Sequence, residues 1–148
     1  MPLFESKQYY NAQNMLLLKE LSTESSVART KVHRDLIVDD NAINRFILGK
    51  YLKRLNVESD TASNGYEAVK LARLYDYDII WMDIKMAICD GLTATYFLRH
   101  NCQYTGKIYG TTGYADEATR KQALECGMTD VLTKPFDASS IVGARSGI

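Results

Sequence analysis

The sequence has no long hydrophobic run, little proline and no excess of charge of either sign. It contains two prolines among 148 residues, and its 18 basic and 18 acidic residues give a net charge of zero. A protein that binds nucleic acid or an anionic membrane through charge usually carries a basic excess, so we expect neither partner. The apolar run from Met15 to Leu18 is only four residues long, far too short to cross a bilayer.

Cysteine is also scarce, and Cys89, Cys102 and Cys126 show no CxxC spacing. The chain does not start with basic residues followed by an apolar core, so no secretion signal is predicted. An odd number of cysteines without such a signal is typical of reduced thiols, and we expect a cytoplasmic protein. Hydrophobic residues make up 46% of the chain, which suffices for the core of one domain.

What the sequence does contain is a regular alternation of short apolar runs and amphipathic segments from about Arg34 onward. The first amphipathic segment places Ile43, Phe46 and Ile47 at helical spacing after Asn41, a plausible N-cap. We predict strands at 35–40, 57–62, 78–83, 107–112 and 130–136, and helices at 41–55, 64–75, 90–98, 115–127 and 138–144. Such alternation favours an α/β fold, with a parallel sheet covered by helices on both faces.

Residues 1–30 have a different character and are predicted to be an extension or linker before a domain of residues 31–148. The segment 6–21 has the pattern of an amphipathic helix, and the polar segment 22–30 is typical of a linker. Two alternatives stay open for this extension: a partly ordered tail, or a helix that docks on the domain or on a partner.

Polar groups close four of the five predicted strands. They are Asp39-Asp40, Asp83, Thr111-Thr112-Gly113 and Lys134-Pro135. Parallel strands bring their carboxyl ends to one edge of the sheet, where α/β proteins bind ligands. Three carboxylates at one edge repel one another, and a hard cation such as Mg²⁺ relieves that repulsion.

This set of groups suits phosphoryl transfer. With a cation bound, one carboxylate can attack a phosphorus atom, while the metal and the lysine neutralise the oxygens of the transferring group. The product is an aspartyl phosphate, which the hydroxyl at the end of the fourth strand and the Lys134 ammonium are suited to bond.

The chain from about Lys31 to Ile141 resembles the receiver (response-regulator) domain of two-component and phosphorelay signalling. The resemblance lies in "LIVDDNAINR", "DIIWMDIKMAICDGLTAT", "IYGTTGYA" and "DVLTKPF", in this order, and "DDNAINRFIL" is similar to receivers associated with hybrid histidine kinases. It implies a flavodoxin-like, doubly wound sheet of five parallel strands in the order 2-1-3-4-5.

The resemblance also implies a role for each matching residue. Asp83 would accept the phosphoryl group. Asp40 would bind Mg²⁺ (or Mn²⁺) directly, Asp39 would hold it through water, and Asp83 and the backbone carbonyl of Lys85 would complete the metal ligands.

At the other strand ends, Thr112 would be the switch hydroxyl that moves onto the phosphoryl oxygen. Lys134 would be the phosphate-binding lysine, and the Lys134-Pro135 peptide bond would be cis.

Three positions depart from the family pattern. Ala87 replaces the usual proline four residues after the acceptor, so we expect a looser loop. Val131 replaces the usual aromatic residue three positions before the lysine. We therefore expect weak coupling between Asp83 and the face formed by the fourth helix, the fifth strand and the fifth helix, or coupling through another residue. Few residues follow Phe136, so the last helix is predicted to be short and a familiar dimer is not expected.

We predict a phospho-accepting receiver that takes its phosphoryl group from a histidine kinase or a histidine phosphotransfer protein. It would catalyse only its own phosphorylation and dephosphorylation, without an independent substrate, and act as a monomer or weak dimer. The main alternative is a degenerate receiver that binds other proteins independently of phosphorylation.

A metal-dependent phosphatase is disfavoured because Lys85 stands where an acid would be needed. A flavodoxin-like cofactor binder is disfavoured because Asp39-Asp40 would repel phosphate.

Overall fold

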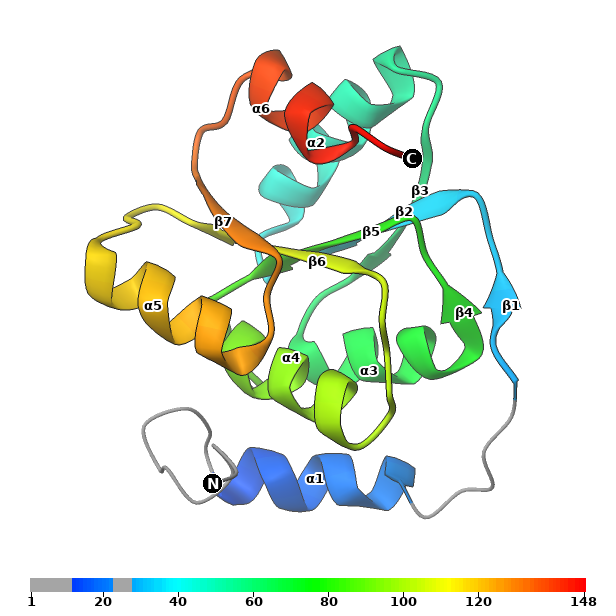
Figure 1. Ribbon diagram of the computed structural model, residues 1–148, viewed down its shortest axis with the longest axis vertical. Coiled ribbons are helices and arrows are strands. Elements are labelled where there is room, and N and C mark those ends of the chain that lie inside the picture. The colour runs from blue at the N-terminus through cyan, green and yellow to red at the C-terminus, as the bar shows by residue number, and fades with distance from the viewer. Residues whose placement is uncertain (1–11, 23–27) are drawn as a thin grey trace.

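The computed structural model describes residues 12–22 and 28–148, and its centre is a sheet of five parallel strands. The strands are β2 (Arg34–Val38), β3 (Glu58–Ala62), β5 (Ile79–Asp83), β6 (Lys107–Thr112) and β7 (Asp130–Thr133). They lie in the order β3-β2-β5-β6-β7, which confirms the predicted doubly wound order (Figure 1). The register sets Val38 beside Met82 and Asp83 beside Thr111, so the strand ends align at one edge.

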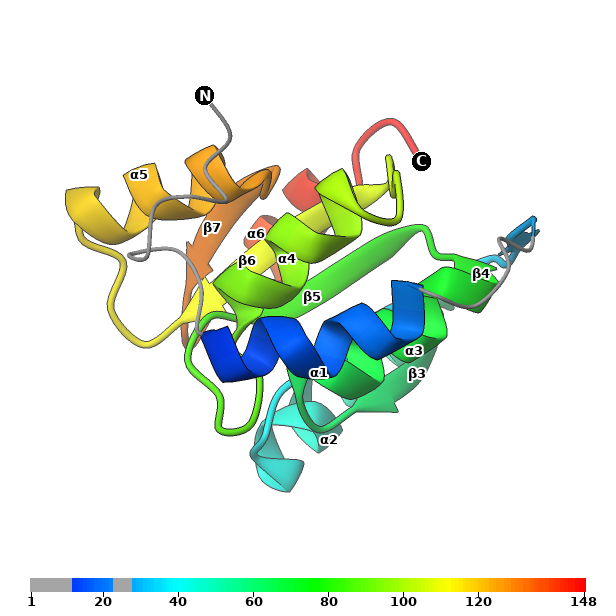
Figure 2. The same ribbon diagram turned by 90° about the horizontal axis from the view of Figure 1, so that it is seen from below.

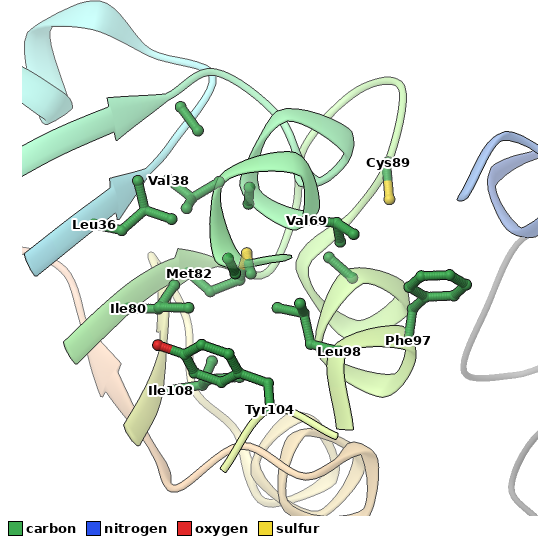
Figure 3. Close-up of a cluster of buried hydrophobic side chains, with 14 of the residues drawn as sticks. Leu36, Val38, Val69, Ile80, Met82, Cys89, Phe97, Leu98, Tyr104 and Ile108 are labelled. Carbon is green, nitrogen blue, oxygen red and sulfur yellow. The ribbon is translucent and has the colours of Figure 1, made fainter. Parts of the chain in front are cut away.

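Five helices cover the two faces of the sheet. The helices α2 (Ala42–Arg54) and α6 (Ala138–Ala144) lie on one face, and α3 (Gly65–Leu74), α4 (Gly91–His100) and α5 (Glu117–Cys126) lie on the other (Figure 1). Each predicted helix is therefore present, within a few residues of its expected ends. Side chains alternate along each strand and supply both faces. Trp81 packs in the cluster under α2 and α6, whereas Ile80 and Met82 point to the opposite cluster (Figure 3).

Local signals set the helix ends, and the N-cap predicted at Asn41 is confirmed. The Asn41 side chain accepts hydrogen bonds from the Ile43 and Asn44 amides, and Asp90 accepts one from the Thr93 amide. Gly127 ends α5 in the left-handed conformation, with φ of 110°. Strand β7 ends at Thr133, earlier than predicted, before Pro135, which has no amide hydrogen to donate to a neighbouring strand.

A further helix, α1 (Ala12–Ser22), packs across α3 and α4 on the side away from the sheet (Figure 2). It overlaps the predicted helix 6–21, of which residues 6–11 lie outside the described residues. After it, β1 (Thr30–Lys31) pairs with β4 (Tyr75–Asp76) in a second, two-stranded parallel sheet. The polar pattern of 22–30 predicts only a linker there, because a strand of two residues carries no periodic pattern.

Two predicted departures can be located in the fold. Helix α6 has only seven residues, and Arg145 follows it and bonds to Asp35 of β2 at 2.5 Å. Val131 is buried in the main core cluster. Weak coupling through Val131 stays a prediction. Among the described residues, no helix has the length and apolar character needed to span a bilayer.

Candidate functional site

The polar groups predicted to meet at one edge come from four strand ends of the central sheet. Asp39 and Asp40 follow β2, Asp83 is the last residue of β5, and Thr112 is the last residue of β6. Lys134 follows β7 directly. The strand order places β5 between β2 and β6, so Asp83 occupies the middle of the row.

The three aspartates form a compact cluster. Asp39, Asp40 and Asp83 each offer a carboxylate oxygen, and these oxygens lie within 4.8 Å of one another. Asp39 is 4% exposed and Asp83 6% exposed, whereas Asp40 is open to solvent. Oxygen ligands of this kind suit a hard cation that keeps several waters, such as Mg²⁺. The residues present therefore fit the metal that the sequence predicted.

Lys134 bridges the two buried aspartates. Its Nζ lies 2.7 Å from Asp39 Oδ2 and 3.4 Å from Asp83 Oδ1. Burial raises the pKa of Asp83 to about 6; the ammonium of Lys134 opposes this shift, and the negative charges of Asp39 and Asp40 add to it. Asp83 is thus a buried carboxylate whose charged form would be stabilised by any further positive charge beside it.

Asp39 is fixed by its backbone as well as by its side chain. Its Oδ1 accepts a hydrogen bond of 2.9 Å from the Asn41 amide, and its amide donates to the Ala62 carbonyl at 3.2 Å. The Arg45 guanidinium donates to the Asp39 carbonyl at 2.7 Å. The sequence does not predict this role of Arg45, since a cation in an amphipathic helix normally faces solvent and nothing in the spacing marks this contact.

The residues predicted for the switch and for the fourth metal ligand lie around this cluster. Thr112 is buried, and its hydroxyl donates to the Tyr114 carbonyl at 3.3 Å. The Lys134 amide donates to the Thr112 carbonyl at 2.7 Å, which joins the ends of β6 and β7. Lys85 and Asp40 line the same shallow hollow beside α4. The Lys134-Pro135 peptide bond is cis, as the resemblance implied.

In the loop between Asp83 and α4, two residues are buried: Ile84 and Cys89. Cys89 is fully buried, and its carbonyl accepts a hydrogen bond of 3.0 Å from the Gly65 amide. Burial raises the pKa of its thiol to about 12. Ile88 is exposed and has φ of 71°, a left-handed conformation that is costly for a β-branched residue.

The fold and the site together define a parallel α/β domain with a cluster of carboxylates at the carboxyl ends of its strands. Residues 36–145 match the family described as response regulator receiver domain. The chain therefore belongs to the receiver family, which confirms the resemblance read from its motifs.

Curated relatives include free-standing regulators and large kinases. The chain is 38% identical over 108 residues to two-component response regulator 24 of Arabidopsis thaliana, covering 72% of this chain and 77% of that protein. It is 33% identical over 108 residues to hybrid signal transduction histidine kinase F of Dictyostelium discoideum, covering 70% of this chain. The match spans only 10% of the length of that kinase.

Solved structures agree with the fold. The receiver domain of the sensor histidine kinase PA1611 from Pseudomonas aeruginosa, with a magnesium ion in its active-site cleft, is 30% identical with a TM-score of 0.67. The match covers 78% of this chain and 93% of that one. The Saccharomyces cerevisiae receiver of Ssk1, solved with the histidine phosphotransfer protein Ypd1, is 28% identical with a TM-score of 0.67 and coverage of 78% and 87%.

Proposed function

We propose that Asp83 accepts a phosphoryl group from a phosphohistidine and that this chain works as a phosphorelay receiver. The supporting observation is the convergence of Asp39, Asp40, Asp83 and Lys134 within hydrogen-bonding or metal-binding distance at one rim of the sheet. A degenerate receiver would have no need to keep a buried, mutually repelling set of carboxylates, and no observation favours that alternative.

In the proposed step, a carboxylate oxygen of Asp83 attacks the phosphorus atom of the phosphohistidine. The new O–P bond forms as the P–N bond breaks, and the imidazole nitrogen keeps the electron pair. Asp39, Asp40, Asp83 and the Lys85 carbonyl would hold Mg²⁺ or Mn²⁺, which supplies positive charge to the oxygens of the transferring group. Lys134, already beside Asp83, supplies the second positive charge from the protein itself.

After transfer, Thr112 is proposed to act as the switch hydroxyl. Its present bond to the Tyr114 carbonyl is long, at 3.3 Å, so the exchange for a charged phosphoryl oxygen is favourable. The chain would catalyse only its own phosphorylation and dephosphorylation, with the phosphodonor and water as the other reactants.

The proposed donor is a histidine kinase or a histidine phosphotransfer protein that docks on α2. This helix begins beside Asp39 and Asp40, and it exposes an apolar row of Ile43, Phe46 and Ile47. Such a row next to the acceptor suits a partner helix that must bring its histidine close to Asp83. We expect the chain itself to be a monomer or weak dimer in the cytoplasm, where its free cysteines stay reduced.

The test is phosphorylation by acetyl phosphate or phosphoramidate with Mg²⁺, followed by intact-protein mass measurement. We expect the wild type to gain one phosphoryl group and Asp83→Asn to gain none. Asp116→Asn is the matched control, because Asp116 lies at the same edge but only caps α5, and asparagine caps a helix equally well. Phosphorylation of Asp83→Asn at the wild-type rate would refute the assignment of the acceptor.

A further inference from the structure

Helix α1 lies outside the matched receiver region and covers a face of the domain that would otherwise be apolar surface. The family match begins at residue 36, whereas α1 spans Ala12–Ser22. Leu18 is 0% exposed and Leu21 is 5% exposed, and both belong to the main core cluster. Leu16, on the outer side of the same helix, is 67% exposed. The helix is thus seated by two leucines on one side.

The core cluster that seats α1 also contains Cys89, a buried residue of the loop between Asp83 and α4. Val69 of α3, Phe97 of α4 and Cys89 are fully buried in the same cluster as Leu18 and Leu21. Figure 3 shows Val69, Cys89 and Phe97 at the outer side of α3 and α4, away from the strand residues Leu36 and Ile80. Because Cys89 is the buried residue of the segment 85–90, the position of that segment depends on the packing around it.

The junction under Cys89 is tightly packed. A Cβ atom placed on Gly65 would lie 2.7 Å from the Cys89 carbonyl oxygen and 2.8 Å from its Sγ. The rest of the loop has weak intrinsic restraint, because Ala87 leaves φ free and Ile88 adopts an unfavourable left-handed conformation. Ile84 is buried and Met86 packs against the same cluster, so the packing of Cys89 adds to theirs in ordering the exposed part of the loop.

The chain is anchored just after α1, independently of it. Arg29 donates from Nε to the Ala72 carbonyl at 2.6 Å and from Nη2 to the Cys102 carbonyl at 2.5 Å. Its guanidinium also lies 5.2 Å from the centre of the Tyr104 ring. Together with the pairing of Thr30 and Lys31 in β1, these bonds keep α1 near its docking face even when it is released. A released α1 then redocks by an intramolecular reaction, which is favoured by its high effective concentration.

We propose that α1 is a detachable brace that packs over Cys89 and thereby holds the loop between Asp83 and α4. Release of α1 uncovers Cys89 and loosens residues 85–90, including the Lys85 carbonyl beside the cation site. The consequence for the phosphoryl group rests on the proposed function: a loose loop admits water and shortens the lifetime of the aspartyl phosphate. A partner that captures α1 would in this way reset the receiver.

The test compares Leu18→Glu with Leu16→Glu, the same substitution at a buried and an exposed position of one helix. Thiol labelling with a maleimide, mapped by peptide mass, gives three internal probes. In Leu18→Glu we expect Cys89 to be labelled about tenfold faster or more, since local opening controls the access to a buried thiol. Leu16→Glu should leave the Cys89 rate within about twofold of the wild type.

The other two cysteines separate local release from unfolding. Cys126 is fully buried in a different cluster with Tyr96, and Cys102 lies beside the Arg29 anchor. Their labelling rates should stay unchanged in both variants. If Leu18→Glu also exposes Cys126, the milder Leu18→Ala replaces it, with the same expectation in the same direction. Unchanged Cys89 labelling in a folded Leu18 variant would overturn the proposal.

Two further measurements complete the experiment. Amide hydrogen exchange over residues 85–90 should be faster in Leu18→Glu and unchanged in Leu16→Glu. The aspartyl phosphate lifetime should shorten by about threefold in Leu18→Glu only. Labelling and exchange need no phosphoryl group, so they test the brace even if Asp83 is not the acceptor. Faster labelling with an unchanged exchange rate over 85–90 would overturn the link to the loop.

Discussion

At the scale of single residues, the buried carboxylates of this protein differ in which groups compensate their negative charge. Asp83 and Asp39 share Lys134, and a cation can add further compensation. Asp35, at the other end of the same sheet, is fully buried and relies on two fixed donors. Trp81 Nε1 donates to its Oδ2 at 2.9 Å, and Arg145 donates to the same oxygen at 2.5 Å. Its Oδ1 is buried without a hydrogen-bond partner in the described part of the chain.

Asp35 leads to a prediction for the pH dependence of stability. Burial raises its pKa above the ordinary value of 3.8, and the bonds from Arg145 and Trp81 oppose the shift without cancelling it. The native state then holds this proton to higher pH than the unfolded chain. The contribution of Asp35 to the free energy of unfolding is fully present below pH 3.8 and falls as pH rises through the raised native pKa.

Substitution of Asp35 by Asn removes this titration. Relative to Asp35→Asn, the wild type should therefore lose stability as the pH rises through that window. Urea unfolding followed by circular dichroism at several pH values measures the difference. A wild type that gains stability relative to Asp35→Asn over the same window would show that the bond to Arg145 lowers the native pKa below the ordinary one.

At the scale of elements, one arginine joins the end of α4 to the segment that follows it and to the end of α5. Arg99, near the end of α4, donates from Nη1 to the Tyr104 and Gly106 carbonyls at 2.7 Å each. Its Nε donates to the carbonyl of Gly127, the residue that ends α5, at 2.9 Å. Gly127 also leaves space for the Arg99 stem, since a Cβ there would lie 2.6 Å from Arg99 Cγ.

Replacement of Arg99 by Met keeps most of the apolar stem but leaves three carbonyls without their donor. We expect Arg99→Met to lower the free energy of unfolding by about 2–3 kcal/mol, because each unsatisfied, partly buried acceptor has a desolvation cost. Arg54→Met, at an exposed position in the last turn of α2, should change it by less than about 0.5 kcal/mol. Equal effects of the two substitutions in urea unfolding would contradict the joining role of Arg99.

At the scale of the whole molecule, the site is a source of instability that a bound cation would relieve. The negative charges of Asp39 and Asp40 both raise the pKa of Asp83, which shows that the cluster is repulsive without a metal. A ligand that binds only the native state stabilises it by mass action. The receiver fold should therefore be more stable in Mg²⁺ than in a chelator.

The whole-molecule prediction uses Asp40→Asn, which removes the exposed member of the cluster. In a chelator this variant should be as stable as the wild type or slightly more so, because one repulsive charge is gone. In Mg²⁺ at one hundred times its dissociation constant, the wild type should gain about 2.7 kcal/mol and the variant much less. Thermal unfolding with and without Mg²⁺ measures both. An equal gain in Asp40→Asn would exclude that residue from the metal site.

Much of this protein could be predicted from the sequence because the relevant signals are local. Strand and helix periods, the N-cap at Asn41, the C-cap at Gly127 and the acidic residues after the strands are all readable from a few neighbouring positions. The rule that parallel strands bring their carboxyl ends to one edge then predicted which side chains meet. The alternation of elements sufficed for this, without any contact being known.

Only the tertiary structure decided the contacts between distant segments. The docking of α1 on α3 and α4, the pairing of Thr30 with Tyr75 and the bond from Arg145 to Asp35 join positions whose spacing has no periodic relation. Local sequence determines which surfaces are apolar or charged, because side-chain chemistry and backbone period are fixed residue by residue. Which of those surfaces meet depends on packing in three dimensions, where many placements compete and no short pattern selects one.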